Sequence, residues 1–363
     1  MRPKKIVYEI ERLNCSEPII YLTMEWSSYK KKFCLAAINS NFDEDYISRC
    51  LDYAYRLNQN KYPIIYSQEH LSNLVGYDQE YLHKISNSQK HCYKNYSIAK
   101  ASGGVRVISE PLPSLKEIQR WVLDEILYKH PVSKYAKAYV PNLSIKDNAR
   151  FHRKQPVVLS LDLSDFFGTI KWFKVYDVFV GIGYSKPVSV MLSNLCTLNK
   201  SLPQGAPTSP ALSNIICLQI DNRISKYAAK NKIRYTRYAD DITLSGNLDV
   251  GAAIKIVSDI VSDYGFKLNN KKTRAMKSSK RQEVTGIVVN ENMRVSKDLI
   301  KELRHACYYI DKYGLESHID RNNITQSNYI HHLLGIANYI KFIRPSDKDA
   351  IAAITILRKY TVS

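Results

Sequence analysis

The sequence predicts an α+β fold in which short antiparallel hairpins alternate with amphipathic helices. Between Ile233 and Gly246, β-forming residues flank Asp240 and Asp241, a pattern that predicts two short strands with the acids at their tip. A second hairpin is predicted for residues 93–108, because paired glycines supply the positive φ of a tight turn. Apolar residues at helical spacing predict helices over residues 44–57, 67–76, 78–85, 115–128 and 211–229 and from about 296 onward.

Local residue types also predict where some elements begin. Ser114 is expected to cap the helix that starts at residue 115, and Ser209 with Pro210 to start the helix over residues 211–229. Residues 284–289 are expected to form one strand. The first 65 residues show the weakest pattern, which suits either a small helical module or a cover over the rest of the fold.

The composition points to a polyanionic partner. The 363-residue chain has a formal charge of +19, and its basic residues are spread along it rather than gathered in a tail. Its 27 tyrosines add flat faces on which bases can stack. The seven cysteines form no CxxC pair, and no apolar run reaches the length of a membrane span. We therefore expect a cytoplasmic protein with reduced thiols and no membrane partner.

Three aspartates are candidate metal ligands. Asp240 and Asp241 are adjacent, and a hairpin tip tolerates two like charges best when a divalent cation neutralises them. Asp162 ends an apolar run typical of a buried strand, where a carboxylate is costly unless it is paired or metal-bound. Mg²⁺ binds carboxylate and phosphate oxygens together, which suits phosphoryl transfer. An isolated Asp-Asp pair can equally be a solvated turn, so the other motifs decide.

Basic and aromatic residues elsewhere suit nucleotide binding, although each also has a plain structural explanation. Lys100 and Arg106 lie beside the Gly-Gly turn, where they can hold a triphosphate or simply be solvated. Phe166 and Phe167 can both be core residues. Alternatively, one of the two rings can lie against the sugar of a nucleotide.

Three further segments leave similar alternatives. The Gly/Pro-rich loop over residues 202–210 runs into a helix, whose first N–H groups can approach anions or base edges. The lysine-rich turn over residues 264–273 is either solvated or brings a cation near a leaving pyrophosphate. Asn148 and His152 are expected to fix the backbone through hydrogen bonds.

Taken in order, these motifs resemble those of reverse transcriptases, and among them the bacterial retron type. The match over residues 93–290 covers the basic hairpin, the strand at 160–167, the loop at 202–210, the Tyr-Ala-Asp-Asp box at 238–241 and the lysine turn. Two segments resemble retron signatures: residues 148–152 fit the NAxxH pattern, and residues 284–286 fit the VTG pattern.

The resemblance implies a right-hand polymerase with fingers, a palm that contains an antiparallel sheet, and a helical thumb. The implied bounds are 1–65 for a mostly helical N-terminal extension, 66–155 for the fingers with part of the palm, 156–290 for the palm with the catalytic motifs, and 291–363 for the thumb and C-terminal RNA-binding region. Two Mg²⁺ ions would be held by the catalytic carboxylates Asp162, Asp240 and Asp241.

The resemblance also implies roles outside the carboxylates. Arg106 and Lys100 would hold the triphosphate, Phe167 would be the aromatic gate that excludes a 2′-hydroxyl, and Gln204 would line the nucleotide pocket. The retron signatures would contribute RNA-binding residues, namely Asn148, His152, Val284, Thr285 and Gly286.

The activity implied is that of a retron RNA-directed DNA polymerase. Using dNTPs, it would copy part of its own structured non-coding RNA into branched single-stranded DNA (msDNA), starting from a guanosine 2′-hydroxyl. An effector protein of the same system would join it in defence against phage. The alternatives are a group II intron-like or diversity-generating reverse transcriptase and, from another class, a catalytically silent RNA-binding scaffold.

Overall fold

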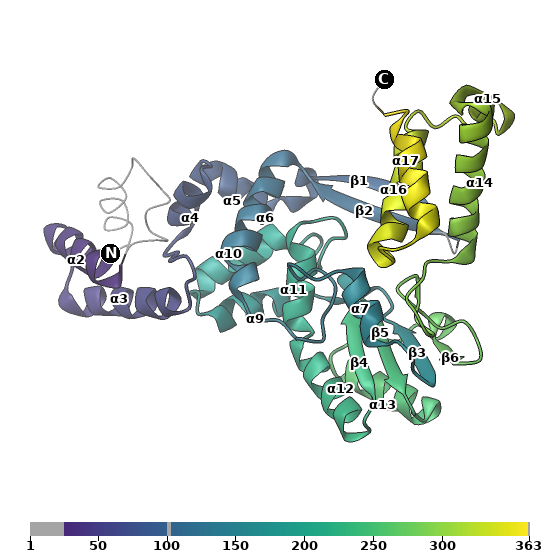
Figure 1. Ribbon diagram of the computed structural model, residues 1–363. Coiled ribbons are helices and arrows are strands. Elements are labelled where there is room, and N and C mark those ends of the chain that lie inside the picture. Colours follow the sequence, from purple (N-terminus) through teal and green to yellow (C-terminus); the bar gives the residue numbers. More distant parts are fainter. Residues whose placement is uncertain (1–24, 100–102, 362–363) are drawn as a thin grey trace. The chain divides into compact units, whose positions relative to one another are not determined.

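The computed structural model describes residues 25–99 and 103–361, which divide into two compact units (Figure 1). The first unit runs up to Ser133 and resumes over Asp165–Gln219. The second comprises Lys134–Ser164 and the chain from Ile220 onward. Lys100, one of the predicted triphosphate ligands, lies outside the described residues. No helix among the described residues is long and apolar enough to cross a membrane.

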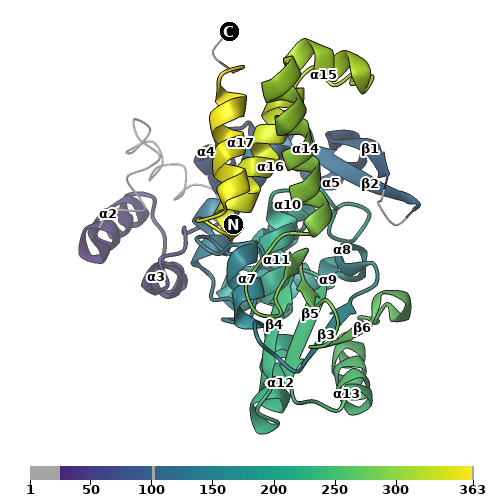
Figure 2. The same ribbon diagram turned by 45° about the vertical axis from the view of Figure 1, so that its right-hand side comes forward.

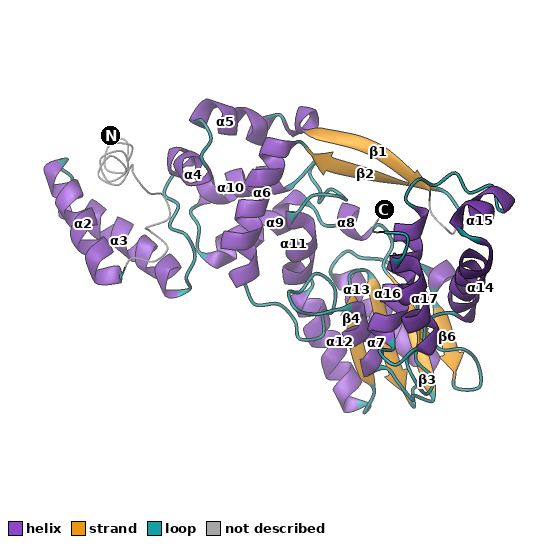
Figure 3. Ribbon diagram, turned by 45° about the horizontal axis from the view of Figure 1, so that its top comes forward, coloured by secondary structure: helices purple, strands orange, loops and turns teal. Residues whose placement is uncertain are grey.

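The first unit is mostly helical, with one long two-stranded hairpin (Figure 3). Its strands β1 (Tyr93–Ala99) and β2 (Val105–Pro111) are antiparallel and place Ile98 opposite Arg106. Its helices are α2 (Trp26–Asn39), α3 (Glu44–Gln59), α4 (Gln68–Val75), α5 (Gln79–Asn87), α6 (Pro113–Glu125), α8 (Phe166–Thr169), α9 (Trp172–Ile182), α10 (Lys186–Cys196) and α11 (Thr208–Ile216).

Aromatic packing forms the core of the N-terminal helices. Tyr29 and Phe33 of α2 are buried with Ala54 of α3 in one cluster. The hydroxyls of Tyr29 and Tyr66 lie 2.9 Å apart, so the tyrosines also satisfy their polar ends inside this cluster. The helices predicted over residues 44–57, 67–76 and 78–85 correspond to α3, α4 and α5.

Two predicted helix starts in the first unit were wrong. Helix α6 begins at Pro113, whose missing N–H costs nothing in the first turn, so Ser114 lies inside the helix rather than capping it. Helix α11 begins at Thr208, directly after Pro207, so Ser209 is likewise inside. The expected single helix over residues 211–229 is two helices, because α11 ends at Ile216 and α12 begins at Leu218, with Cys217 between them.

The second unit is built on a four-stranded antiparallel sheet in the order β4-β5-β3-β6. These strands are β3 (Val157–Asp162), β4 (Arg234–Tyr238), β5 (Asp241–Gly246) and β6 (Arg274–Lys277). The other elements are α7 (Ile145–Phe151), α12 (Leu218–Lys230, which begins at the end of the first unit), α13 (Val250–Asp263), β7 (Glu283–Val284), β8 (Ile287–Val288), α14 (Lys297–Tyr313), α15 (Leu315–Arg321), α16 (Tyr329–Ile343) and α17 (Lys348–Arg358). Figure 2 shows α12 and α13 beside the sheet.

Strand pairing separates the side chains of this sheet into two faces, because residues directly opposite each other share a face. One face carries the pair Asp162 and Asp241 at one end, and Thr236 and Ser245 farther along the strands. The other face carries Leu161, Ile242 and their alternating neighbours, which are fully buried. The polar face therefore presents the predicted acids at one end, although its Val158, opposite Ser245, is buried in a core as the apolar face is.

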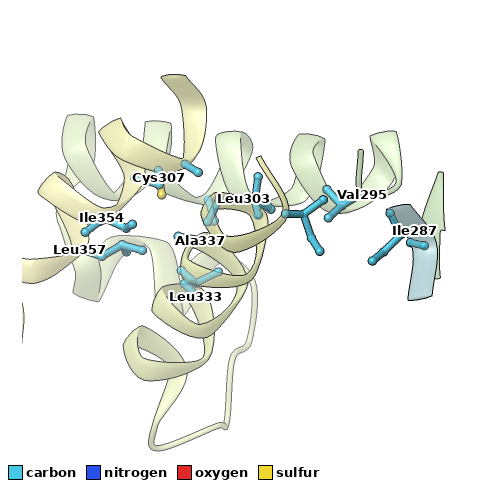
Figure 4. Packing of buried hydrophobic residues seen from close by; sticks show 14 of the residues in the cluster. Ile287, Val295, Leu303, Cys307, Leu333, Ala337, Ile354 and Leu357 are labelled. Carbon is cyan, nitrogen blue, oxygen red and sulfur yellow. The ribbon is translucent and has the colours of Figure 1, made fainter. Parts of the chain in front are cut away.

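The C-terminal helices share one apolar core with the strands beneath them. Figure 4 shows the side chains of this cluster, among them Ile287, Val295, Leu303, Cys307, Leu333, Ala337, Ile354 and Leu357. Ala149 of α7 and Val158 of β3 belong to the same cluster, so α7 packs between the sheet and the C-terminal helices.

The strand predicted over residues 284–289 was wrong, because the segment folds back on itself. Val284 pairs with Ile287 in a hairpin of β7 and β8, and Thr285 and Gly286 form its turn. Their φ angles of 46° and 82° are left-handed and incompatible with an extended strand. The β-propensity of the valines thus applies only to the residues on each side of the turn.

Candidate active site

The predicted hairpin tip is a two-residue turn between β4 and β5. Tyr238 and Asp241 are the last pair of the ladder, which leaves Ala239 and Asp240 to make the turn. Ala239 has a φ of 56°, a left-handed value that Gly usually supplies at the first position of such turns. This strained backbone holds two adjacent carboxylates at the end of a buried sheet.

The structure brings the three predicted aspartates together within the second unit. Asp162 is the residue of β3 directly opposite Asp241 of β5. The backbone N–H of Leu163 donates to the carbonyl oxygen of Asp240 over 3.0 Å, which joins the end of β3 to the turn. Asp162 is only 6% exposed, so its carboxylate has largely left water. We call Asp162, Asp240 and Asp241 the carboxylate cluster.

Burial and neighbouring charges shift the pKa of two groups at this cluster, Asp241 and Lys272. Burial, then the charges of Asp240 and Asp162, raise the pKa of Asp241 to about 6, against the opposing effect of Lys272. Lys272 lies at the cluster: its Nζ is 2.7 Å from Oδ1 of Asp162. That hydrogen bond, followed by the charges of the three aspartates, raises the pKa of Lys272 despite some desolvation. The lysine turn thus contributes one specific cation, which the sequence pattern did not single out.

The donor set suits a hard divalent cation. Its members supply only carboxylate oxygens, and burial, followed by the neighbouring charges of Asp240 and Asp162, raises the pKa of Asp241. In the described part of the chain, no three acidic, His or Cys side chains form a ready-made metal cage. Lys272 holds one oxygen of Asp162 instead. A metal ion that binds this oxygen therefore competes for it with the Lys272 ammonium group.

The turn is braced from the apolar face by an ion pair that sequence reasoning missed. Arg237 of β4 and Asp221 of α12 are both fully buried and make two bonds of 2.8 Å, one from Nε and one from Nη2. Arg237 Nη1 also donates to the carbonyl oxygen of Ala239 over 3.1 Å. A charged residue at an inward-facing strand position was the available signal, but the partner on α12 was not identifiable from spacing.

The retron signature residues Asn148 and His152 are fully buried. The ring nitrogens of His152 lie 2.7 Å from Ser245 Oγ and 2.7 Å from Thr236 Oγ1. Thr236 in turn donates to Asn148 Oδ1 over 2.6 Å. These residues bond to strand side chains, so in this structure they are not placed on the surface where RNA would bind.

The VTG segment has one buried and two accessible members. Val284 is 2% exposed and belongs to the C-terminal core. Thr285 is half-buried and Gly286 is exposed, at the tip of the β7–β8 turn. Any direct contact of this segment with RNA therefore involves the turn rather than Val284.

The remaining predicted nucleotide ligands belong to the first unit. Arg106 is exposed on β2. Phe167 is half-buried in α8, and its ring packs at 60° to that of the buried Phe166, 5.3 Å away. Gln204 is half-buried in its loop, and its carbonyl oxygen accepts from Ser109 N–H over 2.8 Å.

A close approach explains the glycine that follows Gln204. A Cβ on Gly205 would lie 2.8 Å from the Ser109 carbonyl oxygen, and the φ of Gly205 is 127°. Glycine is therefore required where this loop meets β2, which carries Arg106.

Comparison with known proteins places this chain in a family. Residues 98–289 match the family described as reverse transcriptase (RNA-dependent DNA polymerase). The retron Mx65 reverse transcriptase of Myxococcus xanthus is 33% identical over 77% of this chain and 67% of its own. The retron Ec86 reverse transcriptase of Escherichia coli is 33% identical over 70% of this chain and 82% of its own.

Among solved structures, a telomerase from Candida albicans aligns with 77% of this chain and 66% of its own, with a TM-score of 0.43 and 11% identity. The family match begins at the end of β1 and includes β2, the carboxylate cluster and the β7–β8 turn. The retron relatives cover most of the chain, which confirms the predicted resemblance to the retron type. The chain therefore belongs to the retron reverse transcriptases, and it is an RNA-directed DNA polymerase.

Proposed function

We propose that this polymerase copies part of its own structured non-coding RNA into msDNA, beginning at the 2′-hydroxyl of a guanosine. Its dNTP substrates and RNA template suit the strongly basic chain, which carries a formal charge of +19. An effector protein of the same system would be its partner in defence against phage. The observation that carries the catalytic part is the pairing of Asp162 with Asp241 beside Asp240.

The carboxylate cluster is proposed to hold two Mg²⁺ ions. Bound Mg²⁺ would activate the primer hydroxyl and neutralise phosphate oxygens. Asp162 would change partner from Lys272 to the metal, and its place at the end of β3 would keep its carboxylate opposite Asp241. Lys272, once released from Asp162, would remain as a cation next to the phosphates.

The first unit is proposed to select the nucleotide. Arg106 suits bidentate binding of triphosphate oxygens, because its guanidinium is exposed and always charged. Lys100 would assist it. Phe167 would reject a 2′-hydroxyl by bulk, and Gln204 would line the nucleotide pocket. The exposed turn at Thr285 and Gly286 would contact the RNA.

The catalytic proposal is tested by single-nucleotide incorporation on a primed RNA template with Mg²⁺. Asp240→Asn removes one charge with almost no change of shape, and we expect kcat to fall on the order of 10³-fold or more. Asp259→Asn is the matched control, because Asp259 is an exposed acid on α13, and it should retain wild-type kcat. Equal activity of Asp240→Asn and wild type would reject the assigned cluster.

The product is tested separately. Co-expression with the non-coding RNA encoded next to the gene should yield DNA that stays attached to RNA until an enzyme that cleaves 2′–5′ linkages is added. DNA that is free before this treatment would contradict priming from a 2′-hydroxyl, while leaving the polymerase activity intact.

A further inference from the structure

A chain of hydrogen bonds runs through the interior of the second unit from β5 to the β7–β8 turn. Its members are, in order, Ser245, His152, Thr236, Asn148 and Thr285, with successive separations of 2.7, 2.7, 2.6 and 3.4 Å. The first four residues are fully buried. Buried polar groups are costly unless bonded, so each member depends on its neighbours. We call these five residues the hydrogen-bond chain.

The proton positions in this chain follow from its partners. The Thr236 hydroxyl gives its only proton to Asn148 Oδ1, so its oxygen must accept a proton from His152 Nε2. Burial, then the charge of Arg234, lowers the pKa of His152 to about 3, so the imidazole is neutral. Its Nδ1 then accepts from Ser245. This assignment makes every member donate to the next in one direction, ending with Asn148 Nδ2 and Thr285 Oγ1.

One end of the chain fixes the hairpin that presents the carboxylates. His152 bonds to both strands, at Thr236 of β4 and Ser245 of β5. By strand pairing, these two side chains lie on the same face as Asp241. A change in the position of His152 therefore acts on the two strands that hold the Asp240 turn.

The other end of the chain is tied to the β7–β8 turn. Asn148 contacts Thr285, and its neighbour Ala149 is buried in the same cluster as Val284. Backbone bonds add to this attachment, because Lys154 N–H donates to the carbonyl oxygens of Val289 and Asn290 over 3.2 and 3.0 Å. The α7 segment and the β7–β8 hairpin are thus joined at several points.

We propose that Asn148 and His152 are positioning residues that couple the β7–β8 turn to the carboxylate hairpin, so that RNA held at the turn sets the position of Asp240 and Asp241. This inference rests on the proposed contact between the turn and RNA. It gives the NAxxH signature a role inside the protein, while Thr285 and Gly286 make the external contact. Coupling of this kind requires that a substitution at either end of the hydrogen-bond chain alters both RNA binding at the turn and catalysis at the hairpin.

The experiment changes one residue at each end of the chain. Ser245→Ala removes the donor at the hairpin end, and Thr285→Val removes the acceptor at the turn end. The readouts are the Kd for a fluorescein-labelled RNA template annealed to a DNA primer, and kcat for single-nucleotide addition with template and dNTP saturating. The melting temperature of each variant is measured first, and assays run well below the lowest one.

We expect each single variant to raise Kd and to lower kcat, each by about fivefold, as loss of one buried hydrogen bond allows. The double variant should resemble the worse single variant, because either change breaks the same chain. Ser245→Thr and Thr285→Ser, which keep the hydroxyls, should show the Kd and kcat of the wild type. Thr243→Val is the control for loss of a buried hydroxyl, since Thr243 lies on β5 outside the chain.

The inference would be overturned by purely local effects, that is, if Ser245→Ala changed kcat alone and Thr285→Val changed Kd alone. Losses that multiply in the double variant would overturn it too. The proposed RNA contact has its own test within the same data, because a Kd unchanged by Thr285→Val and by the exposed Gly286→Ala would remove the turn from RNA binding. If the wild-type protein failed to extend the primer, the result would instead count against the proposed catalytic site.

Discussion

The hairpin β4–β5 is anchored on its two faces by different chemistry. On the apolar face, Arg237 and Asp221 form a fully buried ion pair that also receives the Tyr235 hydroxyl over 2.6 Å. On the polar face, His152 bonds to Thr236 and Ser245 without carrying a charge. We call the Arg237–Asp221 pair the ionic anchor, and His152 with its bonds to the two strands the neutral anchor. Both anchors are buried.

The difference matters for the carboxylate cluster, which shares its face with the neutral anchor. A charged imidazole would add a further cation to a face that already carries Arg234 opposite Ser245 and Lys272 at the carboxylate cluster. A neutral His152 leaves Lys272 as the cation that Asp162 contacts, among the described residues. The ionic anchor on the opposite face satisfies its own charges, because Asp221 and Arg237 bond to each other at two points. The ion pair therefore satisfies its own buried charges, while the neutral His152 adds none to the face that carries the carboxylate cluster.

The largest effect should come from breaking the ionic anchor. Asp221→Ala leaves the Arg237 guanidinium buried without a counter-charge, which costs about 3–5 kcal/mol of unfolding free energy. Urea unfolding followed by circular dichroism measures this loss. The double variant Asp221→Ala/Arg237→Met removes both charges and should recover much of it. A double variant no more stable than Asp221→Ala would show that packing, rather than uncompensated charge, dominates this site.

Acid should lower the free energy of unfolding through the neutral anchor, because His152 binds a proton when the protein unfolds. The pKa of His152 is about 3 when folded, against about 6.5 in an unfolded chain. Between these values the unfolded state binds more protons, so stability falls as the pH falls, by about 1.4 kcal/mol per pH unit from this residue. From pH 6.5 to pH 5 the contribution is about 2 kcal/mol.

The comparison of wild type with His152→Gln isolates this contribution. Glutamine can keep the bond to Thr236 at the Nε2 position, but it does not titrate. His70, whose burial lowers its pKa to about 4, contributes equally to both proteins and cancels in the difference. We expect a shallower loss of unfolding free energy on acidification for the variant. Parallel curves for the two proteins would mean that His152 does not stay neutral in the folded state.

The parts of the site that sequence patterns could predict are those encoded by neighbouring residues. The run ending at Asp162 and the β-formers around Asp240 each describe a complete local element, and both elements formed as expected. The partners in the two anchors are of another kind: His152 is 93 residues from Ser245 and 84 from Thr236. Only the packed fold brings such residues together, so spacing could suggest that His152 bonds but not to what.

Local propensity failed where one residue in a favourable stretch adopts an unfavourable angle. The valines around residue 284 favour a strand, yet left-handed angles at Thr285 and Gly286 reverse the chain. Ala239, in the turn before Asp240, is a second example, since nothing in an alanine predicts a φ of 56°. In both places the surrounding contacts, among them Asn148 at Thr285 and Arg237 at Ala239, accompany the unusual angle.

The smallest predicted effect concerns this strained turn and has the opposite sign to the others. A left-handed alanine costs about 1–2 kcal/mol, and glycine loses about 0.5–1 kcal/mol more entropy on folding. Ala239→Gly should therefore raise the free energy of unfolding by about 0.5–1 kcal/mol.

Urea unfolding of a matched pair makes this small change measurable. Ala352→Gly is the control, because Ala352 is exposed in the middle of α17, and it should lose about 1 kcal/mol. The same substitution would then stabilise at the turn and destabilise in the helix. If both variants lose stability, the bond from Arg237 to the Ala239 carbonyl has made the left-handed angle inexpensive. In that case the ionic anchor relieves the strain of the turn. If Ala239→Gly instead raises the free energy of unfolding, the strain at residue 239 persists in spite of the anchor.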